Sequence, residues 1–303
     1  MSRPVHVVGA GALGSLLGGL LSRCTRVQIL ARPAHARAIR RQGGVRISFS
    51  SPGLYPVEVT DTLQAPALGA VVLVTVKAFD LETALVPLAP LLQPSHLVVV
   101  LQNGLGIRAA AERVLGRPVV RAVTFMAAAL EEPGHVAFNA SGKTYFPSDG
   151  EVLDLWRESG MPAVRVASIE TYVWRKLAIN AVINPLSALL RVPNGQLLGL
   201  RQITRRLVEE LVEVARCEGQ GLDVDETLLK VQSSMRQTAR NRSSMLQDVC
   251  AGRRTEIDWI NGAVVRLARK HGLGAPHHQA LLELVHFLAQ TGAREAHPAP
   301  LST

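Results

Sequence analysis

Cysteine and aromatic side chains are scarce in this sequence. Its three cysteines, Cys24, Cys217 and Cys250, lie far apart and are odd in number. Because there is no CxxC pair and no His/Cys cluster, a disulfide framework or a zinc site is disfavoured, and a reducing cytoplasm fits. Aromatic residues make up 4% of the chain, and it has no helix-turn-helix or RNA-stacking signature. A nucleic-acid partner is therefore disfavoured as well.

Long hydrophobic runs are also missing. No apolar stretch reaches the ~18 uninterrupted residues that are needed to span a bilayer, so no membrane segment is predicted. The first 22 residues resemble a signal peptide in hydrophobicity, but five glycines interrupt them. The net charge is +9, from 33 Lys and Arg against 24 Asp and Glu. This excess suits an anionic ligand, although many of the arginines fall on ordinary helix faces.

The 303 residues, of which 48% are hydrophobic, suggest two domains. Residues 1–167 alternate short apolar runs with helical patterns, and residues 168–303 are helical almost throughout. We expect an α/β fold, with an N-terminal Rossmann-type doubly wound domain followed by an all-helical C-terminal domain. The cleft between two such domains is a natural place for a site. We expect sheet strands at 5–8, 27–30, 45–48, 57–59, 71–76, 97–101, 119–125 and 135–138.

The segment "VHVVGAGALGSLLGG" has the GxGxxG spacing of a dinucleotide-binding turn. Gly9 would permit the tight turn from strand to helix, Gly11 would let the backbone approach a pyrophosphate, and Gly14 would allow close packing of the helix on the strand. The phosphates would then lie at a helix N-terminus, where N–H groups favour anions. The alternative is a glycine-rich turn without a ligand.

The second strand ends in "ILAR", where NAD-specific folds usually have an acidic residue. A guanidinium can hold a 2′-phosphate that a carboxylate would repel, so Arg32 favours NADP over NAD, unless it is an ordinary exposed arginine. Lys77 and Asn103 follow two further strands, at the edge where open sheets bind ligands. Asn103-Gly104 is also a common turn dipeptide.

The segment "KLAINAVINP" places Lys176, Asn180 and Asn184 at steps of four, on one face of an otherwise apolar helix. This row is either the solvent side of the helix or a polar row that faces a cleft. The two asparagines, which are poor helix formers, favour the cleft. Pro185 suggests that the row ends at a kink. In a cleft, Lys176 could protonate a developing alkoxide, and desolvation could lower its pKa toward that task.

Three later features are less specific. Ser243 and Ser244 could cap a helix or bind a carboxylate, and Asp225 could cap another helix. Glu256 opens a predicted helix over 255–271, where a glutamate favours the helix dipole whatever the function. The histidines at 277, 278 and 286 have no third ligand in view, so we predict no metal.

Together, the motifs "GAGALG", "VKAFD", "QNG", "WRKLAINAVINPLSAL", "VPNGQL", "SSMLQDV" and "TEIDWINGA" resemble the ketopantoate reductase (2-dehydropantoate 2-reductase) family over most of the chain. The resemblance implies reduction of 2-dehydropantoate to (R)-pantoate with NADPH, on the route to pantothenate and coenzyme A. It implies that Lys176 is the general acid. It also implies substrate contacts by Asn103, Asn180, Asn184, Asn194 and Ser244, and cofactor contacts by Gly9, Ala10, Gly11, Ala12, Leu13, Gly14, Arg32, Lys77, Asn103, Ala128 and Glu256. The family often has a histidine near Met126, and this chain does not.

Two other functions remain open from the sequence. One is a related NADPH-dependent reductase of another branched 2-oxo acid, whose polar site residues would look alike. The other is a non-catalytic NADP-sensing module, which would keep the glycines and Arg32 but would not need Lys176. The sequence does not decide between a monomer and a homodimer.

Overall fold

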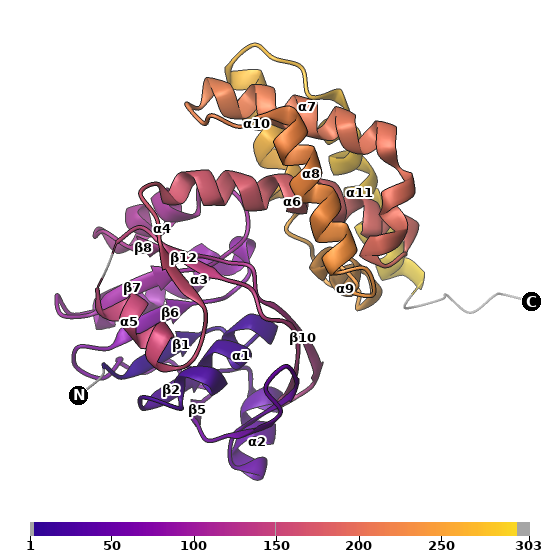
Figure 1. The fold of residues 1–303 in the computed structure, drawn as a ribbon. Coiled ribbons are helices and arrows are strands. Elements are labelled where there is room, and N and C mark those ends of the chain that lie inside the picture. The colour runs from indigo at the N-terminus through magenta and orange to yellow at the C-terminus, as the bar shows by residue number, and fades with distance from the viewer. Residues whose placement is uncertain (1–2, 149, 296–303) are drawn as a thin grey trace, which may run out of the picture. The chain divides into compact units, whose positions relative to one another are not determined.

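The computed structural model describes residues 3–148 and 150–295, with side chains up to residue 290. The chain divides into two compact units. The first contains residues up to 102 and 106–172, and the second contains 103–105 and the chain from 173 onward. The first unit holds the sheets and the second is helical, which confirms the predicted fold class (Figure 1).

The first unit is built on a six-stranded sheet in which every neighbouring pair is parallel. The strand order is β5-β2-β1-β6-β7-β8, so the order reverses between β1 and β6. Both β1 and β6 are buried along their whole length. The continuous aliphatic sequence of β6 predicts this burial, whereas β1 carries the polar side chain of His6, which is also buried. The strands are β1 (Val5–Val8), β2 (Val27–Leu30), β5 (Glu58–Thr60), β6 (Val71–Val74), β7 (Leu97–Val100) and β8 (Val120–Arg121).

Helices connect these strands. Helix α1 contacts β1 and β2 of the parallel sheet and also β3, β10 and β11 of a second sheet, so it lies between two sheets. It can do so because it is apolar on nearly every side. The helices of the first unit are α1 (Ala12–Leu21), α2 (Pro33–Gln42), α3 (Leu81–Leu88), α4 (Ile107–Leu115) and α5 (Glu151–Glu158), with short 3₁₀ helices η1 (Ala78–Asp80) and η2 (Ala89–Leu91).

The prediction of one sheet for all the strands is wrong at three segments. Segments 45–48 and 135–138 belong to a second sheet, of order β10-β11-β3-β4, and segment 119–125 is broken into β8 and β9. Strand β3 of this second sheet alternates buried and exposed residues over its first three positions, which is the pattern of a sheet with one solvated face. The second sheet contains β3 (Val45–Phe49), β4 (Gly53–Tyr55), β10 (Ala127–Glu132) and β11 (His135–Ala140); a third contains β9 (Val123–Thr124), β12 (Thr144–Phe146) and β13 (Ala163–Arg165).

The second unit packs its helices around a separate aliphatic core. Asp223, not Asp225, caps α8: its carboxylate accepts from the Glu226 backbone N–H at 2.8 Å. The predicted helix 255–271 is shorter, because a 3₁₀ turn precedes it. The elements are α6 (Ile169–Leu190), η3 (Asn194–Gly199), α7 (Arg201–Cys217), α8 (Val224–Gln237), α9 (Ser244–Cys250), η4 (Ile257–Trp259), α10 (Asn261–Lys270) and α11 (Pro276–Glu295).

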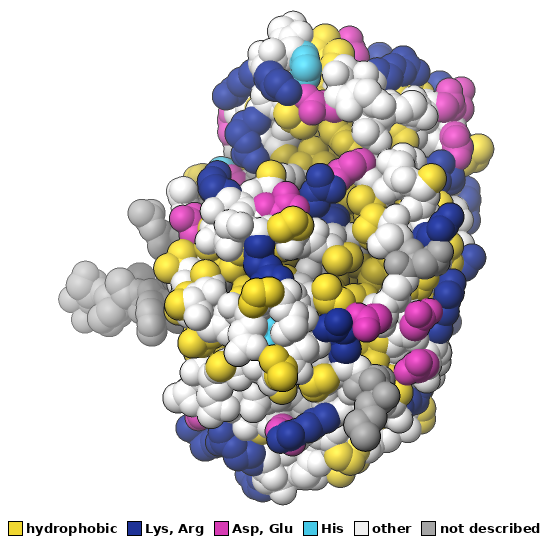
Figure 2. Space-filling view, turned by 90° about the vertical axis from the view of Figure 1, so that its left-hand side faces the viewer, with side chains coloured by type: hydrophobic (Ala, Val, Ile, Leu, Met, Phe, Trp, Pro, Cys, Tyr) yellow, Lys and Arg dark blue, Asp and Glu magenta, His cyan; other side chains and the backbone are white. Residues whose placement is uncertain are grey.

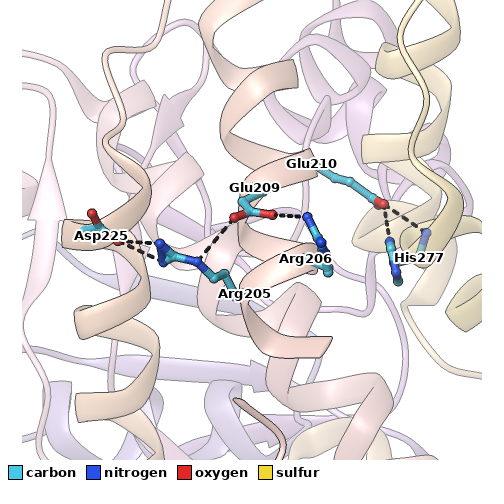
Figure 3. A network of polar contacts seen from close by, with 6 residues as sticks. All are labelled: Arg205, Arg206, Glu209, Glu210, Asp225 and His277. Atoms are coloured by element: carbon cyan, nitrogen blue, oxygen red, sulfur yellow. Dashed lines mark hydrogen bonds and ion pairs between the residues drawn. The ribbon is translucent and has the colours of Figure 1, made fainter. Parts of the chain in front are cut away.

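Polar contacts tie α7 to two neighbouring helices (Figure 3). Arg205 bonds Asp225 at 2.9 Å and Glu209 at 3.3 Å. Glu210 accepts from the backbone N–H groups of His277 and His278 at 3.1 and 3.2 Å, so a carboxylate of α7 caps the first turn of α11. The Arg205 pairs are exposed and are worth little, whereas the Glu210 cap fixes where α11 begins.

On the face drawn in Figure 2, Lys and Arg side chains are interspersed with Asp and Glu side chains. Among the described helices, none combines the length and the hydrophobicity that crossing a membrane would require.

Candidate active site

The glycine-rich turn lies at the carboxyl end of β1, beside the end of β6. Gly9 has φ +107°, and a Cβ on it would lie 2.7 Å from the backbone N of Val76. Both its conformation and its surroundings therefore require glycine. Because the strand order reverses between β1 and β6, the turn sits at the switch point where open sheets bind ligands.

Gly14 and Gly11 serve different purposes in this turn. A Cβ on Gly14 would collide with the carbonyl oxygen of Gly9 and the hydroxyl of Thr75, so Gly14 lets α1 pack directly against the turn. Gly11 is exposed, and a Cβ there would meet no atom within 4 Å, which leaves room for a ligand. No side chain in the described part of the chain caps α1, so its first N–H groups are available to an anion. Ala10, Ala12 and Leu13, between these glycines, are half-buried.

Arg32 follows β2 and is the N-cap residue of α2. Its side chain is exposed and makes no ion pair among the described residues. The preceding Ala31 is buried, so Arg32 is the first charged side chain after the strand. This position suits a guanidinium that binds a 2′-phosphate.

A buried hydrogen-bonded chain connects α2 to the glycine-rich turn. The Gly134 N–H donates to His35 Nδ1 at 3.0 Å, and His35 Nε2 lies 2.9 Å from Ser15 Oγ. Ser15 Oγ in turn donates to the Ala10 carbonyl at 3.3 Å. Because Nδ1 accepts, Nε2 carries the proton of a neutral imidazole, and burial lowers the pKa of His35.

Lys77 and Ala128 lie elsewhere in the first unit. Lys77 comes three residues after β6, is half-buried, and immediately precedes η1. Ala128 lies on β10 in the second sheet, where it pairs with Phe138 and packs against the core that surrounds α1. Of these two residues, Lys77 is the one at the carboxyl edge of the parallel sheet.

Lys176, Asn180 and Asn184 lie on α6 at steps of one turn. Lys176 and Asn180 are half-buried and Asn184 is buried, with 6% of its surface exposed. Asn184 therefore does not lie on a solvent face, and Lys176 and Asn180 are partly shielded from solvent. The helix also continues past Pro185 to Leu190, so the proline does not end it.

Asn103 and Glu256 meet although they are 153 residues apart. Asn103 Nδ2 donates to Glu256 Oε2 at 3.2 Å, and Glu256 is 5% exposed. Gly104 (φ +93°) lets this segment approach Trp259, since a Cβ would lie 2.7 Å from Trp259 Cβ. The sequence pattern predicts Glu256 in the first turn of a long helix. In the structure Glu256 instead precedes the short 3₁₀ helix η4. Its carboxylate is therefore held by a side-chain amide.

Asn194 and the two serines lie near the ends of short helices. Asn194 is 7% exposed; its Nδ2 donates to Thr238 Oγ1 at 2.9 Å, and its Oδ1 is buried without a partner among the described residues. Ser243 caps α9 through the Leu246 N–H at 3.1 Å, and its hydroxyl also lies 3.5 Å from the Asn184 carbonyl. Ser244 is exposed, so its hydroxyl is not used as the cap.

Sequence reasoning missed Thr75, His35 and Thr238, which hold the glycine-rich turn and Asn194. Thr75 was findable, because it follows a buried strand at the ligand-binding edge; the other two carry no pattern of their own. Within residues 3–148 and 150–290, no three His, Cys, Asp or Glu side chains are grouped as metal ligands would be.

Comparisons with known proteins identify the family of the chain. Residues 5–150 match the family described as "Ketopantoate reductase PanE/ApbA", and residues 168–289 match "Ketopantoate reductase PanE/ApbA C terminal". The chain is 36% identical over 296 residues to the 2-dehydropantoate 2-reductase of Archaeoglobus fulgidus, covering 93% of this chain and 96% of that one. It is 32% identical over 302 residues to that of Vibrio cholerae, covering 96% and 99%.

Solved structures point the same way. A PanE/ApbA family ketopantoate reductase from Ralstonia eutropha JMP134 superimposes with a TM-score of 0.88 at 31% identity, covering 96% of this chain and all of that one. D-mandelate dehydrogenase with NADH and anilino(oxo)acetate gives 0.89 at 27% identity, with 96% and 99% covered. The family matches span most of the chain, and both carry the same name. The protein therefore belongs to the ketopantoate reductase PanE/ApbA family.

Proposed function

We propose that this protein is a 2-dehydropantoate 2-reductase that reduces the ketone of 2-dehydropantoate to the alcohol of (R)-pantoate with NADPH. The observation that carries the proposal is the row of Lys176, Asn180 and Asn184, placed along one helix in a chain of this family. We propose that residues 1–167 bind the dinucleotide and that residues 168–303 bind the substrate and supply the proton.

The first unit offers a fit for a dinucleotide phosphate. Gly11 leaves open space at the uncapped N-terminus of α1, and Gly9 and Gly14 keep the turn close to β6. Arg32 would hold the 2′-phosphate, and Lys77 would lie at the same edge of the sheet. When bound, NADPH supplies the hydride that reduces the ketone carbon.

The second unit would handle the substrate. As the ketone carbon is reduced, its oxygen becomes an alkoxide, and Lys176 would donate a proton to that oxygen. Asn180 and Asn184 would orient the substrate by hydrogen bonds to its hydroxyl and carboxylate, together with Asn194 and Ser244.

Asn103 and Glu256 would act as a connected pair. Glu256 Oε2 accepts from Asn103 Nδ2, which fixes the side-chain amide and leaves its carbonyl oxygen to other partners. We propose that Asn103 contacts both the nicotinamide and the substrate, that Glu256 contacts the cofactor, and that the backbone of Ala128 contributes a further cofactor contact.

The test is NADPH oxidation, followed by absorbance, in the presence of 2-dehydropantoate. We expect saturable turnover that falls by ~10²-fold or more in Lys176→Ala, while NADPH binding stays near that of the wild type. Wild-type turnover that survives Lys176→Ala unchanged would remove Lys176 as the acid. NADPH binding without turnover of any 2-oxo acid would favour an NADP-sensing module instead.

A second candidate is an NAD(P)H-dependent reductase of another 2-oxo acid. It is favoured by the similarity to D-mandelate dehydrogenase, whose structure contains NADH and anilino(oxo)acetate. Steady-state kinetics with 2-dehydropantoate, other branched 2-oxo acids and phenylglyoxylate separate the two candidates. The primary assignment requires kcat/KM to be highest for 2-dehydropantoate, and near-equal values for all of the acids would reject it.

We also propose that the enzyme works in the cytoplasm, as a monomer or a homodimer. All three cysteines are free thiols, and Cys217 and Cys250 are exposed, which suits a reducing compartment. Analytical ultracentrifugation at micromolar concentration distinguishes the two assembly states.

A further inference from the structure

Helix α6, which carries the polar row, lacks one of its own hydrogen bonds. In an α-helix the N–H of residue 185 would donate to the carbonyl of residue 181, but Pro185 has no N–H. The Ala181 carbonyl is buried within the helical core, where water does not replace the missing donor. The gap falls between Asn180 and Asn184, the two amides that we assign to the substrate.

The side chain of Asn261 fills this gap. Its Nδ2 donates to the Ala181 carbonyl at 2.9 Å and lies 3.0 Å from His278 Nδ1. Asn261 is the first residue of α10 and has no exposed surface. Its Oδ1 has no partner among the described residues. Burying this oxygen without a hydrogen bond destabilises the fold, whereas the two contacts of Nδ2 stabilise it.

His278 fixes which way this amide points. Its Nε2 lies 2.9 Å from the Leu207 carbonyl, which only accepts, so Nε2 carries the proton and Nδ1 is an acceptor. An amide turned the other way would place its oxygen against two acceptors, the Ala181 carbonyl and His278 Nδ1. The hydrogen bonds run from the Leu207 carbonyl through His278 and Asn261 to the Ala181 carbonyl, and we call this chain the relay. Its two side chains are fully buried, and it connects α7, α11, α10 and α6.

We propose that Asn261, oriented by His278, is a positioning residue that replaces the backbone hydrogen bond lost at Pro185 and thereby sets the direction in which Lys176, Asn180 and Asn184 are presented. A proline weakens the ladder of a helix at the residue four before it, and the two halves of the helix can then bend relative to each other. A donor fixed to α10 holds the carbonyl in one place. The proposal rests on the proposed function for its catalytic consequence, but the relay itself does not.

The test is a double-mutant cycle with Asn261→Ala and Pro185→Ala. Alanine at position 185 restores the backbone N–H, so the helix no longer needs Asn261. In the natural background we expect Asn261→Ala to raise the unfolding constant by ~10-fold or more and to lower kcat by a similar factor. In the Pro185→Ala background we expect both effects to shrink to ~3-fold or less.

Two readouts separate this role from simple packing. A packing role would give the same loss in both backgrounds, because an alanine in place of Pro185 does not refill the space that the asparagine leaves. NADPH affinity should stay within ~2-fold of the wild type throughout, since no residue of the glycine-rich turn is changed. If Asn261→Ala does not fold, recovery of folding in the double variant is the expected result.

Equal losses of stability in the two backgrounds would overturn the relay, as would a double variant that fails to recover folding. If the effects of Asn261→Ala and Pro185→Ala on stability are coupled but kcat is unchanged in Asn261→Ala, the positioning role is overturned. The unfolding measurements need no substrate, and wild-type turnover of 2-dehydropantoate is measured separately. A failure of the proposed function is therefore distinguishable from a failure of this inference.

Discussion

Acid should weaken the first unit through His35. Its imidazole is 6% exposed and neutral, with Nδ1 accepting from the Gly134 N–H and Nε2 donating to Ser15. A proton added to Nδ1 would face the Gly134 N–H and would replace that hydrogen bond with a repulsion between two donors. The folded state therefore resists protonation, and burial lowers the pKa of this histidine.

The size and sign of the effect follow from the difference between the two states. In the unfolded chain His35 has an ordinary pKa of 6.5, so below that pH the unfolded state binds a proton that the folded state does not. Stability from this group is fully present above pH 6.5, falls as the pH drops below it, and stops falling once the folded-state pKa is reached. Between pH 7.5 and 5.5 one such histidine removes up to about 1.4 kcal/mol from the free energy of unfolding.

The assay is denaturant unfolding of the wild type, His35→Gln and Ser15→Ala at pH 7.5 and 5.5, without cofactor. Over this interval the wild type should lose more stability than His35→Gln, by up to about 1.4 kcal/mol, because the variant has no imidazole to titrate. Ser15→Ala is the matched control, because it removes one bond of the chain but keeps the titrating group. It should be less stable at both pH values and keep most of the wild-type pH dependence. The reasoning is refuted if His35→Gln and the wild type lose the same stability.

Three further substitutions test the site. Gly14→Ala should lower stability by about 1–3 kcal/mol and should also lower NADPH affinity, because the added methyl group collides with the turn itself. Gly11→Ala should weaken only NADPH binding, since its methyl group meets open space. Calorimetry measures the stability of both variants, and titration measures their NADPH affinity. Arg32→Asp should weaken NADPH by roughly 10–100-fold, with a much smaller change for NADH; equal losses for the two cofactors would remove the 2′-phosphate argument. Gly104→Ala adds left-handed strain of about 1–2 kcal/mol and a clash with Trp259, so it should displace Asn103 and lower kcat, as steady-state kinetics would reveal; an unchanged kcat would contradict the role of that amide.

Local chemistry made the parallel sheet and its glycine-rich turn predictable. Continuous aliphatic runs such as β6 and β7 suit strands buried on both faces. The GxGxxG spacing predicts glycine at Gly9 and Gly14, where the structure leaves no room for a Cβ. The second sheet was not predictable, because β3 and β11 pair across about 90 residues and neither strand specifies its partner.

The candidate site was predictable only where one helix carries it. The fixed period of α6 placed Lys176, Asn180 and Asn184 together without tertiary information. The hydrogen bond from Asn103 to Glu256 joins residues that are 153 positions apart in the sequence, so no local pattern predicts it. The choice of Asp223 over Asp225 as a cap depended on where the helix begins, which is the least reliable part of a sequence prediction.

The three residues 103–105 have a consequence for dissecting the protein. They follow β7 in the chain, yet they belong with the helices: Leu105 packs on the helical core, and its N–H donates to the Trp259 carbonyl at 3.2 Å. A recombinant fragment that starts at residue 168 or 173 would therefore lose the partly buried Leu105 side chain from the helical core and would deprive the Glu256 carboxylate of the Asn103 amide donor. Splitting the gene at that junction should yield an aggregation-prone C-terminal half, which a short covalently grafted Asn-Gly-Leu segment could rescue.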